Sequence, residues 1–104
     1  MKKEYQKLVR DRIPEIIEGT GKRAVCRTLT EDEYLSMLDR KIDEELAEYR
    51  EAHSPEEMAD LLEVLFSEIR ARGYDPMQIE RIRAEKAASR GGFAKRILLE
   101  SVEE

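Results

Sequence analysis

The sequence predicts a mainly α-helical protein, a helical bundle around a central antiparallel helix hairpin with a small two-strand β element. Charged residues make up 41% of the chain and hydrophobic residues 40%, a mixture that suits amphipathic helices and argues against disorder. Apolar residues recur at helical spacing over long stretches, and capping residues precede these stretches. The 104 residues fit a single domain over 1–104 with a thin core, so we expect a partner subunit.

The N-terminal part is expected to hold one short helix and one strand. Residues 5–18 begin as an irregular piece and continue as a short helix, with Pro14 in the first turn, where a missing N–H does no harm. Gly19 and Gly21 end this helix. Residues 23–29 are short and partly β-branched, which is typical of an edge strand.

Three longer helices are expected to follow, each opened by a capping signal. These signals are the capping box of Thr30 with Glu33, Ser54 before Pro55, and Asp75 before Pro76. The helices are predicted to cover about 30–52, 54–72 and 75–89. An arginine and two glycines at 90–92 break the chain, and residues 93–101 are predicted to form the second strand.

The two central helices carry carboxylates at the margins of their apolar faces. On a wheel of about 100° per residue, the arc of the first consists of Tyr34, Leu35, Leu38, Ile42, Leu46 and Tyr49. Glu45 falls inside the edge of this arc, Glu48 lies just outside it, and Glu44 points to the far side. The arc of the second consists of Met58, Leu61, Leu62, Leu65 and Ile69. Glu57 lies within its margin and Asp60 borders it. Carboxylates on a buried face are costly unless they are paired or bind a metal.

The turn at about 52–53 folds these helices back on each other, so they should pack antiparallel. Reflection about the turn sets Glu48 opposite Glu57. It also sets Glu45 opposite Asp60. Four carboxylates thus converge from two helices, and they would repel one another without a cation. All-oxygen ligation suits Mg²⁺ or Mn²⁺, so the sequence predicts a metal site made of Glu45, Glu48, Glu57 and Asp60.

Two alternatives leave these carboxylates without a metal. Glu57 stands three residues after Ser54 and can simply close a capping box. Glu45 and Glu48 can pair with Lys41 at helical spacing as a surface ion network. The coincidence of four carboxylates in register favours the metal site over either alternative.

Three motifs carry a resemblance to a known family: EELAE at 44–48 followed by EMAD at 57–60, YQKLVRDRIPEII near the start, and KAASRGGFAKRILLE near the end. Together they resemble the MazG-like all-α nucleoside triphosphate pyrophosphohydrolases, in a compact branch near the phosphoribosyl-ATP pyrophosphohydrolases. The resemblance implies Mg²⁺-dependent hydrolysis of a nucleoside triphosphate, or a related nucleotide, to a monophosphate and pyrophosphate. It implies a house-cleaning role and a homodimer or higher homo-oligomer.

The resemblance also implies residue roles. It makes the same carboxylates the metal ligands and the catalytic residues, namely Glu45, Glu48, Glu57 and Asp60, and it gives Glu44 at most an indirect role. Only eight residues, 49–56, separate the two acidic motifs, fewer than in many relatives. We therefore expect the connector to provide less protein surface for contact with a nucleobase than it does in those relatives.

Positively charged side chains near a leaving pyrophosphate stabilise its developing charge, and such electrostatic stabilisation supplies most of the catalysis of phosphoryl transfer. The candidates for substrate binding are Lys7, Arg10, Arg12, Lys41, Lys86 and Arg90. The arginines near the N-terminus can instead pair with Asp11, Glu15 or a partner's helix. Gly91-Gly92 either lets the backbone approach a phosphate or only turns the chain.

Composition also argues against several classes of protein. The net charge of −5 argues against nucleic-acid binding, and a single cysteine, Cys26, allows no internal disulfide. Neither a signal peptide nor an apolar run of membrane length is evident, so we expect a cytoplasmic protein with no membrane partner. Two other functions stay open: phosphoribosyl-ATP hydrolysis in histidine synthesis, and a non-catalytic helical dimerisation or regulatory module.

Overall fold

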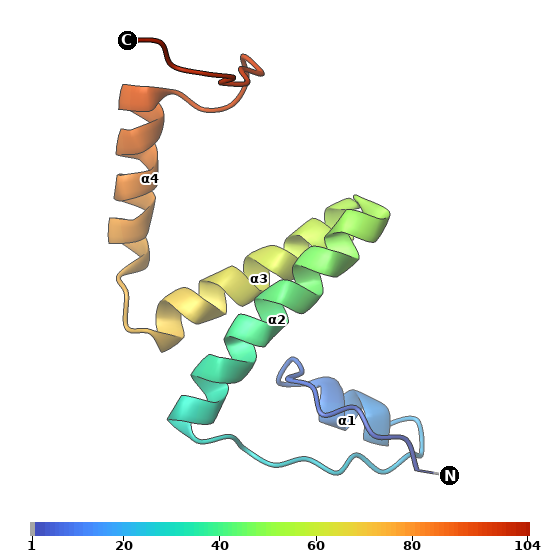
Figure 1. Cartoon of the computed structure of the whole chain (residues 1–104). Coiled ribbons are helices and arrows are strands. Elements are labelled where there is room, and N and C mark those ends of the chain that lie inside the picture. Colours follow the sequence, from blue (N-terminus) through green and yellow to red (C-terminus); the bar gives the residue numbers. More distant parts are fainter. Residues whose placement is uncertain (1) are drawn as a thin grey trace. The chain divides into compact units, whose positions relative to one another are not determined.

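The computed structural model describes residues 2–104 (Figure 1). Within them the chain forms four helices: α1 (Ile13–Glu18), α2 (Glu31–Ala52), α3 (Pro55–Ala71) and α4 (Pro76–Arg90). The chain divides into two units, of which the first ends at Gly73 and the second covers Tyr74–Glu104. The mainly helical class is confirmed, whereas the single domain over 1–104 stays a prediction.

Helix α2 begins at the predicted capping box. Thr30 Oγ1 accepts the N–H of Glu33 at 3.3 Å, and Glu33 Oε1 accepts the N–H of Thr30 at 3.0 Å. Arg27 donates two further hydrogen bonds to the Glu33 carboxylate, at 2.8 and 3.1 Å. The guanidinium and the cap lower the pKa of Glu33 to about 2. The first turn of α2 is therefore held by side chains on both sides of the helix start.

A two-residue turn joins α2 to α3 and makes the antiparallel hairpin (Figure 1). His53 takes the left-handed conformation, with φ of 50°, and its ring lies edge-on to Tyr49 with the ring centroids 5.2 Å apart. Ser54 then caps α3 by accepting the N–H of Glu57 at 3.2 Å. The hairpin is confirmed, and the bundle around it stays a prediction.

The core between α2 and α3 is small. Only Leu38, Val64 and Glu45 are buried among the described residues, with exposed fractions of 2%, 9% and 7%. The predicted arc of α2 faces this core, since each of its members is buried or half-buried. One of the three buried residues is thus a carboxylate.

The predicted arc of α3 is partly wrong: Leu61 and Ile69 are half-buried, but the other three members are exposed. Met58, Leu62 and Leu65, expected inside, are exposed, whereas Val64 is buried in their place. Apolar residues occur on both sides of α3, so periodicity alone does not choose a face. The packed face is the one that carries Glu57, and it leaves an apolar strip on the other side of α3.

The predicted two-strand β element is not supported. Neither 23–29 nor 93–101 is a strand, and within 2–104 the chain forms no strand at all. A strand needs a ladder partner for its backbone groups, and an isolated pair is marginal in water. Most side chains in both segments are exposed, for example Val25 at 82% and Phe93 at 98%, so burial does not hold either segment in a sheet.

The second unit contains one helix and no buried residue. Asp75 caps α4 by accepting the N–H of Met77 at 2.9 Å, and Gly91, with φ of 85°, ends the helix. Every residue from Tyr74 onward is exposed. None of the described helices combines the length and apolar character needed to cross a bilayer.

Replacing Thr30 with alanine removes the acceptor that caps α2. We expect a loss of about 1 kcal/mol in the free energy of unfolding, measured by urea denaturation followed by circular dichroism at pH 7. Thr28→Ala is the matched control, because Thr28 is exposed and lies before the cap. Equal stability of the Thr30 variant and the wild type would contradict the role of the box.

Candidate metal centre

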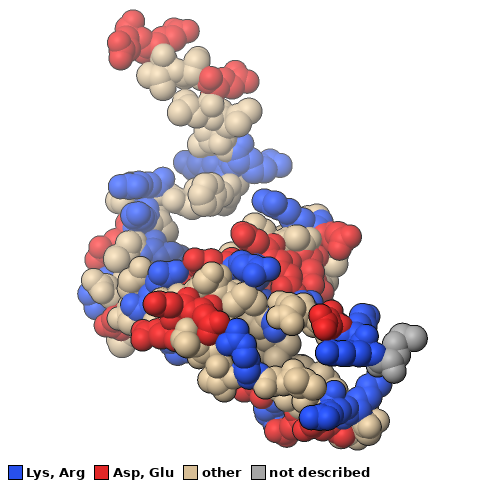
Figure 2. Space-filling model, turned by 60° about the horizontal axis from the view of Figure 1, so that its bottom comes forward, with Lys and Arg blue, Asp and Glu red and all other residues tan. Residues whose placement is uncertain are grey.

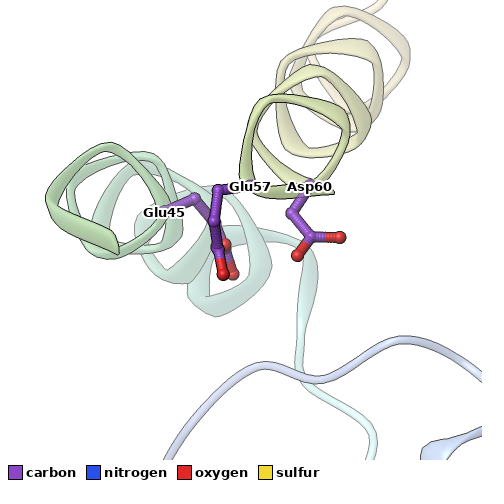
Figure 3. A group of neighbouring side chains, drawn as sticks. All are labelled: Glu45, Glu57 and Asp60. Carbon is purple, nitrogen blue, oxygen red and sulfur yellow. The ribbon is translucent and has the colours of Figure 1, made fainter. Parts of the chain in front are cut away.

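Three carboxylates from the two packed helices converge at one place. Glu45 comes from α2, and Glu57 and Asp60 come from the first turns of α3. Each offers one oxygen, and these three oxygens all lie within 4.8 Å of one another (Figure 3). A spacing of three residues puts Glu57 and Asp60 on one face of α3, and the hairpin turns that face toward α2. We call these three residues the acidic cluster.

The acidic cluster contains buried oxygens that no protein group satisfies. Glu45 is 7% exposed, and its Oε2 has no hydrogen-bond partner among the described residues. The same holds for Oε2 of Glu57. Lys41 Nζ lies 3.4 Å from the other oxygen of Glu45, so the charge is only partly compensated. Buried carboxylate oxygens without partners are costly, and an all-oxygen donor set of this kind fits a hard divalent cation.

Glu48 lies beside the acidic cluster but outside its tight grouping. Burial raises the pKa of Glu45 first, and the charge of Glu48 raises it further. Burial likewise raises the pKa of Glu57, with Glu48 and Asp60 adding to the effect. The four carboxylates therefore interact electrostatically, and three of them offer oxygens within 4.8 Å of one another. A ligand role for Glu48 stays a prediction.

A basic segment ahead of α1 meets the acidic residues of the hairpin. Arg10 Nη2 lies 2.8 Å from Asp60 Oδ1. Lys7 Nζ lies 2.9 Å from Oε1 of Glu44, and Glu44 raises the pKa of Lys7. On the face shown in Figure 2, Lys and Arg side chains are interspersed with Asp and Glu side chains. The N-terminal segment thus brings Lys7 and Arg10, two of the cations predicted to bind substrate, next to the acidic residues of the hairpin.

The wheel placed Glu44 on the far side of α2, away from the apolar arc, but this side is not open to solvent. Glu44 is half-buried, and its Oε1 lies between Lys7 and Lys41, at 2.9 and 3.1 Å. The reason is that the N-terminal segment packs along this side of α2. A helical wheel contains only one helix and cannot show such a neighbour.

Both alternatives for the carboxylates can now be weighed. The N–H of Glu57 does donate to Ser54, but the carboxylate of Glu57 belongs to the acidic cluster, so the cap uses only the backbone. Lys41 does pair with Glu45, yet the Lys41 side chain is only 17% exposed. This ion pair is therefore part of the packed site rather than a surface network.

Of the remaining predicted cations, one forms a local ion pair and two belong to the second unit. Arg12 pairs with Glu15 of the short helix that follows, at 2.9 Å, and this is the structural alternative foreseen for it. Lys86 and Arg90 belong to α4 in the second unit. There Arg90 lines a shallow hollow of about 320 Å³ with the two glycines Gly91 and Gly92. A role for Lys86 or Arg90 in substrate binding stays a prediction.

A second hollow lies next to the site, between the N-terminal segment and α2. Its volume is about 300 Å³, at the lower end of the range for small-molecule pockets. It is lined by Tyr5, Gln6, Lys7, Leu8, Met37, Arg40, Lys41 and Glu44. Sequence reasoning missed Tyr5 and Arg40. The adjacent cations Arg40 and Lys41 in a mostly acidic helix were the one signal available.

Comparison with known proteins finds similarity over a segment of the chain. No family model matches the chain, and no solved structure matches it. An uncharacterised protein of Mycolicibacterium smegmatis is 60% identical over 45 residues. These residues are 43% of this chain and 46% of that protein, so the match spans less than half of either.

Glu45→Gln is expected to stabilise the cation-free protein at pH 7. Because the pKa of Glu45 is raised on folding, the folded state holds the proton more tightly, and stability falls as the pH rises through the raised pKa. Glutamine mimics the protonated acid, so we expect the thermal midpoint in EDTA to rise by about a few degrees. The gain should shrink at pH 4, where the carboxyl is largely protonated in both states.

The control for this substitution is Glu51→Gln, at an exposed position of the same helix. It should leave the midpoint unchanged at both pH values. A lower midpoint for Glu45→Gln at pH 7 would mean that Lys41 compensates the buried charge fully.

Proposed function

We propose that the protein is a Mg²⁺-dependent, MazG-like pyrophosphohydrolase that converts a nucleoside triphosphate, or a related nucleotide, to a monophosphate and pyrophosphate in the cytoplasm. The observation that carries the proposal is the pair of partnerless buried carboxylate oxygens at Glu45 and Glu57, within a cluster that basic side chains flank. The motifs that resemble this family supply the acidic residues at the same positions.

The chemistry of the donors supports the choice of ligand. Glu45, Glu57 and Asp60 offer only oxygens, which Mg²⁺ prefers, and Mn²⁺ would bind the same set. A bound Mg²⁺ would neutralise phosphate charge and orient the attacking water. The basic residues Lys7, Lys41 and Arg10 lie around the acidic residues. The carboxylates would bind the cation, and the basic side chains would bind the polyphosphate.

The reaction needs a base as well as a binding site. In the proposed step a water oxygen bonds to the α-phosphorus, the bond between this phosphorus and the bridging oxygen breaks, and pyrophosphate leaves with that oxygen. The water proton passes to a carboxylate. Glu48 is the carboxylate we assign, because it lies near the cluster but outside the three oxygens at ligand spacing. Lys7 and Arg10 then balance the charge that develops on the leaving group.

We also propose that the protein works as a homodimer or higher homo-oligomer. The outer side of α3 carries an apolar strip of Met58, Leu62, Leu65 and Phe66, which are 38 to 50% exposed. Among residues 2–104 only two apolar residues are buried, Leu38 and Val64. A second copy packed on the strip would bury more apolar surface and would complete a bundle around the hairpin.

Glu48→Gln is expected to reduce pyrophosphate release at least about a hundredfold, because it removes the proton acceptor. The assay uses a panel of nucleoside triphosphates together with phosphoribosyl-ATP, with Mg²⁺ or with EDTA. Glu51→Gln, one turn further along α2 and exposed, should keep wild-type rates. Release that persists in EDTA, or in the Glu48 variant, would refute the assigned chemistry.

Leu65→Glu is expected to split the oligomer into monomers, because it puts a charge in the middle of the apolar strip. Size-exclusion chromatography with light scattering measures the mass. Ile16→Glu is the matched control, since Ile16 is 57% exposed but lies on α1. A monomeric wild type would contradict the proposed assembly and leave the catalytic proposal standing.

A further inference from the structure

Arg10 forms a long-range contact that ties the N-terminal segment to the hairpin. Its Nη2 lies 2.8 Å from Asp60 Oδ1, across fifty residues of sequence. Both side chains are well exposed, at 58% and 42%, so the pair is of the weak, water-screened kind. A contact of this strength can be exchanged for a stronger one without unfolding the protein.

Side chains, rather than backbone hydrogen bonds, hold the N-terminal segment in place. No backbone hydrogen bond involves residues 2–9 in the described part of the chain. Lys7 and Arg10 provide its ion pairs to the hairpin, and Leu8 is half-buried. Gln6 has φ of 48°, a left-handed conformation that costs a non-glycine residue free energy. Leaving the hairpin would therefore relieve local strain in the segment.

Asp60 is shared between this contact and the acidic cluster. Its carboxylate offers one of the three oxygens at ligand spacing, and it also accepts Arg10. A guanidinium and a divalent cation on one small carboxylate repel each other, because both need its negative charge. Lys7 differs in this respect, since its partner Glu44 is not one of the three.

We propose that Arg10 is a displaceable counter-ion, so that residues 5–10 form a strap that Arg10 fastens to Asp60 until a divalent cation takes that carboxylate. Once displaced, Arg10 is free to pair with an anionic ligand such as a phosphate. The inference rests on the proposed function, because it requires a cation site at the acidic cluster. It adds a coupling between cation binding and the position of the N-terminal segment.

The test is a calorimetric titration of Mn²⁺ alone into the full-length protein, without nucleotide. Arg10→Ala removes the competitor, so we expect Mn²⁺ to bind about two- to fivefold more tightly, as the strength of an exposed ion pair allows. Arg12→Ala is the matched control, because it removes the same charge from a residue paired with Glu15. Lys7→Ala removes a cation near the cluster whose partner is Glu44. Arg12→Ala should bind Mn²⁺ like the wild type, and Lys7→Ala should strengthen binding less than Arg10→Ala does. Circular dichroism checks that all variants fold.

The outcomes separate this inference from the function on which it rests. If the wild type binds Mn²⁺ but Arg10→Ala binds it equally or less tightly, the strap is refuted and the cation site stands. If Lys7→Ala strengthens Mn²⁺ binding as much as Arg10→Ala does, the gain comes from the general loss of positive charge near the site. Displacement of Arg10 from Asp60 is then refuted as well. If the wild type binds no Mn²⁺, both the strap and the proposed function fall.

Discussion

The two-residue turn between α2 and α3 is the constraint on which the rest of the site depends. His53 in the left-handed conformation reverses the chain, and Ser54 starts the next helix at once. The register of the two helices follows from this turn. Because each residue of a helix advances the face by about 100°, one extra residue would rotate Glu57 and Asp60 away from Glu45. In this chain the acidic cluster therefore depends on the register that the two-residue turn sets.

Repulsion between its carboxylates makes the acidic cluster electrostatically unfavourable. Glu45 is one of the three residues that are buried in the described part of the chain, and burial together with Glu48 raises its pKa. A hairpin with so few buried apolar side chains gains little from packing to offset such a charge. This imbalance has two physical remedies: a cation that satisfies the carboxylates, and a partner that covers the apolar strip of α3. Both remedies come from outside the single chain. We therefore propose the cation site and the assembly together.

The basic N-terminal segment supplies positive charge that partly compensates the acidic residues of the hairpin. Lys7 and Arg10 precede the hairpin by many residues, yet they pair with Glu44 and Asp60. The protein thus brings together cations and carboxylates that are separated in the sequence. Such a mixed site suits a ligand that itself carries both signs, which is the character of a phosphate group with its metal ion.

Local signals in the sequence determined the helices and much of the hairpin. Capping boxes, proline at helix starts and glycine at helix ends act between near neighbours, so Thr30, Ser54 and Asp75 could be read directly as helix starts. The convergence of carboxylates also followed from sequence, because helical period and loop length set the register of two adjacent helices. The expected strands at 23–29 and 93–101 failed, since strand propensity without a ladder partner does not make a sheet.

Only the tertiary structure decided which face of α3 is packed, which residues surround Glu44 and which cations reach the cluster. Val64 rather than Leu62 or Leu65 is buried, because α3 is apolar on both sides and the contact with α2 makes the choice. Arg10 reaches Asp60 while Arg12 turns to Glu15, although a single residue separates them and no local rule distinguishes them. The physical reason is the same in each case. Local periodicity fixes the direction of a side chain relative to its own helix, and only the packing of distant segments determines what lies in that direction.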